Sequence, residues 1–186
     1  MSSSPILQFL TAAGRLKQLP RTGWLQNNIP NPESVADHSF RLSLFALSFG
    51  HLIPGVDVSK AVFMSIVHDL AESIVGDITP HDTHISKEQK LAMELSAIQQ
   101  LTKDLPSDLS HTVSSLFYEY EDQSSPTAVF VKLMDKFEMI LTAAEYENQH
   151  DLPLCSFFDS VTKDMKGVDD KVLIEIFEGI KKMRKF

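Results

Sequence analysis

Residues 58–77 read VSKAVFMSIVHDLAESIVGD, and this stretch decides the fold class. Its apolar residues recur at three- and four-residue spacing, which predicts a helix that stops at Gly76. An imidazole and a carboxylate, His68 and Asp69, stand next to each other inside that apolar run. An acidic side chain is costly to bury unless it is paired or bound to a metal ion. The helix is therefore predicted to carry a functional site.

A metal ion can use both members of the His68-Asp69 dyad. Adjacent side chains on a helix diverge by about 100° and do not face each other, whereas an ion takes ligands from two directions. His38 and Asp135 stand in the apolar stripes of two other predicted helices. Taken alone, His38 is more typical of a core histidine, and Asp135 fits a surface carboxylate or one paired with Lys132 equally well. With the dyad they supply two imidazole nitrogens and two carboxylate oxygens, which suit Mn, Co, Fe, Zn or Mg-like ions.

Glu72 stands one turn after the dyad, on the same predicted face of the helix as His68. A carboxylate there can hold a metal-coordinated water or shuttle a proton without binding the ion itself. Metal-assisted hydrolysis needs this arrangement, because the ion lowers the pKa of water and a nearby base completes the proton transfer. The spacing therefore indicates a metal-centred hydrolytic site.

The rest of the chain is also predicted to be helical, and strand-type alternation is absent over any useful length. Proline, glycine and capping residues place the boundaries of the helices. The predicted helices span about 5–14, 34–49, 58–76 (capped by Asp57 or Ser59), 87–103, 106–120, 126–147 and 169–184, with a short one possible near 157–158. Residues 19–32 are predicted as turns. The sequence thus predicts one all-α domain over 1–186, with about seven or eight helices.

The composition is that of an ordinary globular protein, with 186 residues, 23% charged and 43% hydrophobic. No apolar run approaches the roughly 20 residues that span a bilayer, and the N-terminus lacks a secretory signal, so no membrane partner is expected. The single cysteine, Cys155, excludes an intramolecular disulfide and favours a cytoplasmic location, with nuclear access not excluded. A net charge of −8 argues against a nucleic-acid polymer as partner, but it allows a small phosphorylated substrate.

Other reactive groups in the sequence lack a clear pattern. His81 and His84 flank the polar loop after Asp77 and could add ligands for a second metal ion, but the simpler interpretation is a pair of surface histidines. Cys155 has no base nearby in sequence. A P-loop, a Rossmann glycine pattern and a Gly-x-Ser-x-Gly elbow are all absent.

Five ordered blocks resemble the HD-domain metal-dependent phosphohydrolases, and more closely their 5'-deoxynucleotidase branch. The resemblance covers about residues 6–180, nearly the whole chain. A bare His-Asp pair is weak evidence, whereas five blocks in order are specific. The blocks are RTGW at 21–24, ESVADHS at 33–39, HDLAE at 68–72, GDITP at 76–80 and KLMDKFEM at 132–139.

The resemblance implies an all-helical, usually homodimeric enzyme that removes the 5'-phosphate from deoxyribonucleoside monophosphates by metal-activated water. It implies one divalent ion, such as Co, Mn or Mg. Glu72 matches the general acid/base, and Asp77 matches a residue that orients the attacking water or protonates the leaving group. The implied metal ligands are His38, His68, Asp69 and Asp135.

The resemblance also implies substrate contacts near the N-terminus. Arg21 and Trp24 match an arginine and a tryptophan that border the phosphate and the sugar, although Thr22-Gly23 separates them here. Glu33 is implied to fasten the loop near the site. A buried structural role for Trp24 remains an open alternative.

Two other functions remain open. One is hydrolysis of another phosphorylated nucleotide, and the other is a non-catalytic metal- or nucleotide-binding regulator. Glu72 and Asp77 weigh against the regulator, because binding alone needs neither of them. Dinuclear members of the superfamily need extra helical histidines before the last Asp, and His111 is the one such candidate. A single ion is therefore expected, its identity open among Mn, Co, Mg, Fe and Zn.

Overall fold

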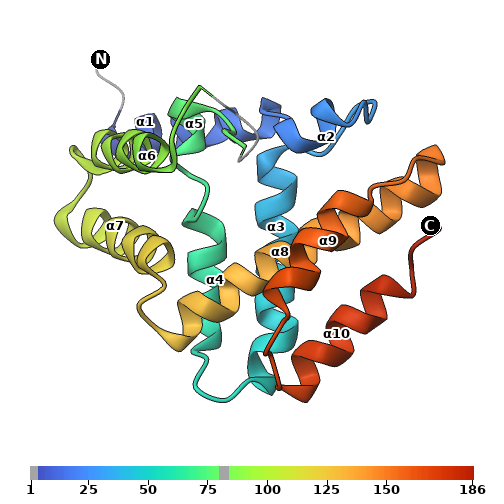
Figure 1. Ribbon diagram of the computed structural model, residues 1–186. Coiled ribbons are helices and arrows are strands. Elements are labelled where there is room, and N and C mark those ends of the chain that lie inside the picture. The colour runs from blue at the N-terminus through green and yellow to red at the C-terminus, as the bar shows by residue number, and fades with distance from the viewer. Residues whose placement is uncertain (1–3, 80–83) are drawn as a thin grey trace.

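The computed structural model describes residues 4–79 and 84–186, which form a bundle of helices (Figure 1). Within these residues there is no β-strand, and Pro20 and Ser34 form an isolated bridge. Eight of the described α-helices have nine residues or more, which confirms the predicted all-α class and the predicted seven or eight helices. The eight are α1 (Pro5–Ala13), α3 (Val35–Phe49), α4 (Val58–Val67), α6 (Lys87–Thr102), α7 (Ser107–Asp122), α8 (Pro126–His150), α9 (Cys155–Asp164) and α10 (Lys171–Lys181).

Several of these helices begin at the capping residues that the sequence predicted. Ser34 begins α3 with a capping box, because its hydroxyl accepts the Asp37 N–H and the Asp37 carboxylate accepts the Ser34 N–H. Ser86 begins α6 in the same way. Asp57, rather than Ser59, caps α4 by accepting the N–H of Lys60.

The predicted continuous helix over 58–76 is wrong, because the chain turns at the His-Asp dyad. Helix α4 ends at Val67, residues 68–71 form tight turns, and the short α5 (Glu72–Val75) follows. In a continuous α-helix the Ser65 carbonyl accepts the N–H of Asp69, but here it accepts Nδ1–H of His68 at 2.9 Å. The Glu72 N–H then bonds the Asp69 carbonyl, three residues back. The spacing of apolar residues in the sequence could not predict this change of hydrogen-bond pattern.

Two further helices differ from the prediction. The short α2 (Thr22–Gln26) lies in the segment predicted as turns, and its first N–H donates to the Asp77 carboxylate, 55 residues away. Helix α9 extends over ten residues around the predicted short helix at 157–158. Neither the residues of α2 nor those around Asp77 form a sequence pattern that would predict this contact. Two 3-10 segments, Gly14–Gln18 and Gly50–Leu52, complete the described elements.

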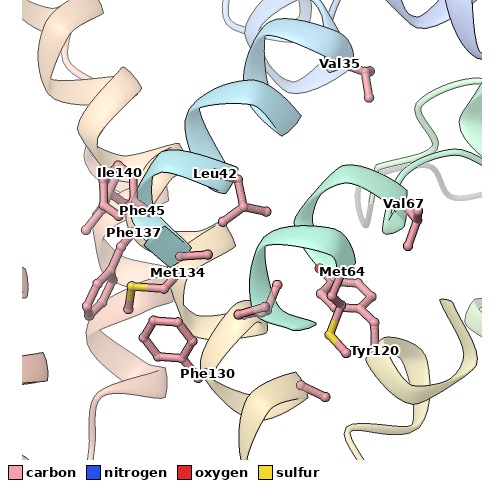
Figure 2. Packing of buried hydrophobic residues seen from close by; sticks show 14 of the residues in the cluster. Val35, Leu42, Phe45, Met64, Val67, Tyr120, Phe130, Met134, Phe137 and Ile140 are labelled. Carbon is pink, nitrogen blue, oxygen red and sulfur yellow. The ribbon is translucent and has the colours of Figure 1, made fainter. Parts of the chain in front are cut away.

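The core lies between α3, α4 and α8, which pack against one another at the centre of the bundle (Figure 1). Figure 2 shows buried side chains of these helices: Met64 of α4 lies beside Tyr120 of α7, and Met134 of α8 lies near Phe130 and Phe137 of the same helix. Small residues in the interface let the helices approach closely; Ala61 of α4 is fully buried. No described helix combines the length and the apolar character needed to cross a membrane. The helices that form the core also carry the polar site.

Candidate metal centre and active site

The structure brings the four predicted metal ligands together from three parts of the chain. His38 extends from α3, His68 and Asp69 from the turn after α4, and Asp135 from α8. His68 Nε2 lies 3.0 Å from Asp69 Oδ2, and His38 Nε2 lies 3.8 Å from the same oxygen. Asp135 Oδ1 lies 3.2 Å from His38 Nε2. Ligand atoms of His38, His68 and Asp69 all lie within 4.8 Å of one another.

Both imidazoles are arranged as metal ligands are. His38 donates Nδ1–H to the Glu138 carboxylate, and His68 donates Nδ1–H to the Ser65 carbonyl. In each ring Nε2 is therefore the nitrogen that faces the carboxylates. Both Nε2 atoms are buried, and neither makes a hydrogen bond within the described part of the chain. Two buried, unbonded nitrogens beside two carboxylates fit a divalent cation.

The electrostatics of the cluster favour a cation. Burial raises the pKa of Asp69 and of Asp135, but the two imidazoles outweigh burial and bring both values well below the usual range. Burial and the nearby Arg21 lower the pKa of His38, but Glu138 and Asp135 outweigh them and raise it to about 9. A cation that binds His38 Nε2 therefore displaces a proton.

Asp135 is held by Tyr120, which sequence reasoning missed, and Lys132 contacts that tyrosine rather than pairing with Asp135 by a hydrogen bond. Tyr120 of α7 donates its hydroxyl to Asp135 Oδ2 at 2.7 Å, and Lys132 donates to that hydroxyl at 3.1 Å. The rings of Tyr120 and His68 also pack at a steep angle, with centroids 5.1 Å apart. These contacts leave Asp135 Oδ1 facing His38. The sequence of α7 could not predict this role of Tyr120, because nothing in that helix indicates a hydrogen bond to a carboxylate on α8.

Glu72, the candidate general acid/base, lies at the start of α5 and is 7% exposed. Its Oε2 is buried and has no hydrogen-bond partner within the described residues. Burial, and then the charges of Asp69 and Asp77, raise the pKa of Glu72 well above its ordinary value, although Lys90 and Arg21 oppose the shift. A carboxyl group with a raised pKa holds a proton more readily than an ordinary glutamate does, which suits a group that must accept a proton and return it.

Asp77 connects the segment after α5 to the loop that carries Arg21. Its Oδ2 accepts the Thr22 N–H at 2.5 Å, and its carbonyl accepts the Thr22 hydroxyl at 2.7 Å. Asp77 therefore fixes the start of α2 beside the cluster of carboxylates.

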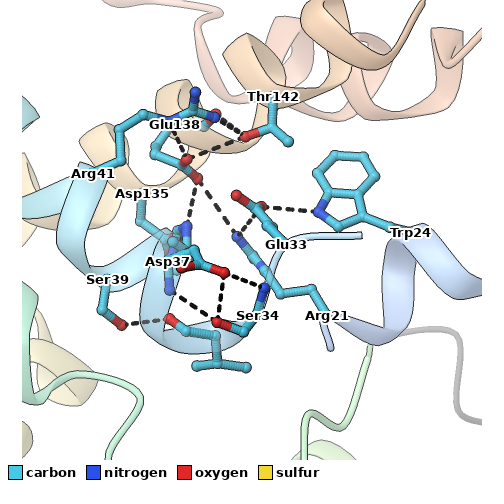
Figure 3. Close-up of polar contacts among 12 residues, drawn as sticks. Arg21, Trp24, Glu33, Ser34, Asp37, Ser39, Arg41, Asp135, Glu138 and Thr142 are labelled. Atoms are coloured by element: carbon cyan, nitrogen blue, oxygen red, sulfur yellow. Dashed lines mark hydrogen bonds and ion pairs between the residues drawn. The ribbon is translucent and has the colours of Figure 1, made fainter. Parts of the chain in front are cut away.

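Arg21 and Glu33 lie at one edge of the cluster (Figure 3). Arg21 Nη1 is 3.8 Å from Glu33 Oε1 and 3.6 Å from Glu138 Oε2, and it makes no hydrogen bond among the described residues. The Arg21 N–H bonds the Glu33 carbonyl, and the Glu33 N–H donates to the Tyr146 hydroxyl. Glu33 thus fastens this loop, and Arg21 keeps a buried donor free for another acceptor.

Trp24 is placed differently from the substrate contact that the resemblance implied. It is 1% exposed, with its ring against Phe157 at 4.5 Å and Tyr146 at 5.3 Å between centroids. Its Nε1–H donates to Glu33 Oε1 at 2.9 Å. The structure gives Trp24 no exposed face, so its position is that of a support for Glu33.

Glu138 is the buried carboxylate behind His38, and sequence reasoning gave it no role. The available signal was its spacing, because it follows Asp135 by three residues and so lies on the same face of α8. Glu33, His38 and Glu138 also form a second group that could chelate a cation. The Arg21 guanidinium already lies close to both of those carboxylates.

Of the two loop histidines, His84 can be placed, and it does not add to the cluster. His84 is exposed and belongs to neither candidate metal group found among residues 4–79 and 84–186. His81 lies outside the described residues.

Comparisons with known proteins agree with this geometry. The HD-domain family matches residues 13–177. The 5'-deoxynucleotidase HDDC2 of Bos taurus is 46% identical over 159 residues, which cover 83% of this chain and 75% of that protein. The 5'-deoxynucleotidase hdd1 of Schizosaccharomyces pombe is 45% identical over 79% of this chain and 75% of that protein. The crystal structure of the PH0347 protein from Pyrococcus horikoshii superposes with a TM-score of 0.81 at 31% identity, covering 96% of this chain and 99% of that one.

Proposed function

The chain belongs to the HD-domain family, and on that premise we propose that it is a metal-dependent 5'-deoxynucleotidase. It converts a deoxyribonucleoside 5'-monophosphate and water into the deoxyribonucleoside and phosphate. The observation that carries the proposal is the pair of buried, unbonded Nε2 atoms of His38 and His68, which face two ionised carboxylates. The name 5'-deoxynucleotidase, carried by the relatives from Bos taurus and Schizosaccharomyces pombe, supports the substrate class.

One divalent cation is proposed to bind at His38, His68, Asp69 and Asp135. Such an ion supplies charge that lowers the pKa of a bound water and offsets the negative charge of the phosphate. Glu72 takes a proton from the attacking water as the new P–O bond forms. The bond from phosphorus to the 5'-oxygen breaks, and that oxygen receives a proton. The raised pKa of Glu72 suits it to both transfers.

Asp77 is proposed to assist at the leaving-group side. One carboxylate oxygen is taken by the Thr22 N–H, so the other is the one that orients the water or returns a proton. Through the same bond Asp77 keeps the Arg21 loop next to Glu72.

Arg21 is proposed to bind the phosphate, because its buried Nη1 lacks a hydrogen-bond partner within the described chain. We expect Arg21→Gln to raise KM about 10- to 100-fold, since a charged hydrogen bond contributes about 1.5–3 kcal/mol. Metal affinity, measured by equilibrium dialysis, should stay unchanged. Arg15→Gln, an exposed arginine of the preceding 3-10 segment, is the control. Equal KM values for Arg21→Gln and wild type would remove Arg21 from the phosphate site.

A phosphate-release assay tests the substrate and the metal together. The protein is stripped with a chelator, and Co, Mn, Mg or Zn is added back with deoxy- and ribonucleoside monophosphates and a nucleotide diester. We expect hydrolysis of the deoxynucleotides, its loss on chelation, and its return with at least one ion. Absence of turnover on every deoxynucleotide with every ion would refute the proposal. Faster release from the diester would favour the alternative of another phosphorylated nucleotide.

A homodimer and a cytoplasmic location are also proposed. Phe40, Leu44 and Leu47 recur on one exposed face of α3, and Phe63 and Ile66 are exposed on α4. A set of large apolar side chains on adjacent helices is typical of a protein interface. Light scattering on the purified chain should give twice the monomer mass, and a monomer mass at micromolar concentration would exclude the dimer. The single cysteine supports a reducing compartment.

A further inference from the structure

One buried carboxylate, that of Glu138, meets both a candidate metal ligand and the candidate phosphate-binding residue (Figure 3). The side chain of Glu138 is fully buried in α8. Its Oε2 accepts Nδ1–H of His38 and faces Arg21 Nη1 at 3.6 Å. Its Oε1 accepts Arg41 Nε at 2.7 Å and the Thr142 hydroxyl at 3.1 Å. The two oxygens therefore meet different partners.

Arg41 keeps the Oε1 side of Glu138 in place. Besides donating to Glu138, its guanidinium donates to the Thr142 hydroxyl and, at 2.7 Å, to Glu145 Oε2. A residue of α3 thus holds three side chains of α8 at once. Arg41 compensates the negative charge of Glu138. Glu138 therefore does not need a bond to Arg21 for charge compensation, and Oε2 can accept from His38 while Arg21 stays free to bind another anion.

We propose that Glu138 is a positioning residue that fixes a metal ligand and the phosphate-binding arginine with one carboxylate oxygen. Oε2 fixes the ring of His38 so that Nε2 faces the cation, which is how partners behind metal-bound histidines act. The same oxygen attracts Arg21 but stays beyond hydrogen-bond distance, so a phosphate oxygen can take the donor without breaking a bond. This inference rests on the proposed function.

The same helix contains a matched residue with a purely structural setting. Glu147 is also fully buried in α8, and it also accepts from an arginine, with Arg184 Nη2 at 2.7 Å and Nε at 3.1 Å. It belongs to neither candidate metal group among the described residues. Burial and an arginine partner are therefore common to both glutamates, whereas contact with His38 and Arg21 is specific to Glu138.

The test compares Glu138→Gln with Glu147→Gln in the full chain. Mn²⁺ affinity of the metal-stripped protein is measured by equilibrium dialysis, KM by phosphate release, and Tm by thermal unfolding. We expect Glu138→Gln to weaken Mn²⁺ binding about 10- to 100-fold and to raise KM. Glu147→Gln should lower Tm about as much as Glu138→Gln does. It should leave Mn²⁺ affinity within about twofold of wild type, because Glu147 does not interact with the metal site.

Two outcomes overturn the inference. One is wild-type Mn²⁺ affinity in Glu138→Gln, and the other is equal weakening in both variants. If the wild-type protein binds Mn²⁺ but hydrolyses no deoxynucleotide, the proposed function fails while the dialysis result still decides the role of Glu138.

A second variant covers the case in which Glu138→Gln does not fold. Arg41 is partly exposed, so we expect Arg41→Gln to fold. It removes the arginine bond to Oε1, while Thr142 still donates to that oxygen and the bond from His38 to Oε2 remains. We expect Mn²⁺ affinity to fall several-fold, less than for loss of the carboxylate itself. Unchanged affinity in Arg41→Gln, with Glu138→Gln unfolded, would refute the positioning role.

Discussion

Replacing Glu72 by glutamine is expected to lower kcat by about 100- to 10,000-fold, the usual contribution of a positioned acid/base. Glutamine keeps the volume of the side chain but cannot accept the proton of water. Because Glu72 is not proposed as a ligand, bound metal should remain at the wild-type level. The measurements are kcat at saturating deoxynucleotide and metal content after dialysis.

The pH profile adds a second readout of the same substitution. Burial and the charges of Asp69 and Asp77 raise the pKa of Glu72, so the carboxyl group holds its proton to higher pH than an exposed glutamate does. The wild-type kcat/KM should therefore rise with pH through the raised pKa, and this acidic limb should vanish in Glu72→Gln. Glu94→Gln, which alters an equally buried carboxylate on α6, is the control and should retain the limb. Equal metal loss and rate loss in Glu72→Gln would instead make Glu72 a ligand.

The same raised pKa has a consequence for folding of the metal-free protein. A carboxyl group whose pKa is higher in the folded than in the unfolded state binds more protons when folded. Its contribution to stability is therefore present at low pH and is lost as pH rises through the raised pKa. As the pH rises, the Tm of the metal-free wild type should therefore fall below that of Glu72→Gln, which carries no charge at this position.

Replacing Asp69 by alanine is expected to abolish both metal binding and turnover. Asp69 Oδ2 is the oxygen that lies within 4 Å of both imidazole Nε2 atoms, so its loss removes a ligand and the anion between the two rings. We expect Mn²⁺ affinity to fall by at least about 100-fold, the upper range for damage to partners of a metal site. The Tm increase that Mn²⁺ gives the wild type should also disappear.

Asp164→Ala is the control for Asp69→Ala. Asp164 of α9 is an exposed carboxylate whose ion pair with Lys136, at 2.7 Å, lies on the outside of the bundle. Its removal should leave Mn²⁺ affinity and kcat unchanged, because exposed ion pairs contribute little. Retention of Mn²⁺ binding and turnover by Asp69→Ala would show that the dyad is not the centre of the metal site.

The sequence could indicate those parts of the site that break a local pattern. His68 and Asp69 stood out because they interrupt an apolar run, and His38 and Asp135 because they stand in apolar stripes. Tyr120 could not be found in this way, because its neighbours give no reason to expect a bond to Asp135 on another helix. Trp24 could be read as a substrate contact or as a core residue, and only its packing against Phe157 and Tyr146 placed it in the core.

From the amino-acid sequence alone, most of the helices and the group of residues suited to metal chemistry could be predicted. These follow from interactions within about four residues, such as the capping boxes at Ser34 and Ser86, and from apolar periodicity. The tertiary structure decided where the helix breaks at the His-Asp dyad and what holds each ligand. Glu138 meets His38 across 100 residues of sequence and Arg41 across 97, and contacts over such separations arise only when the helices pack.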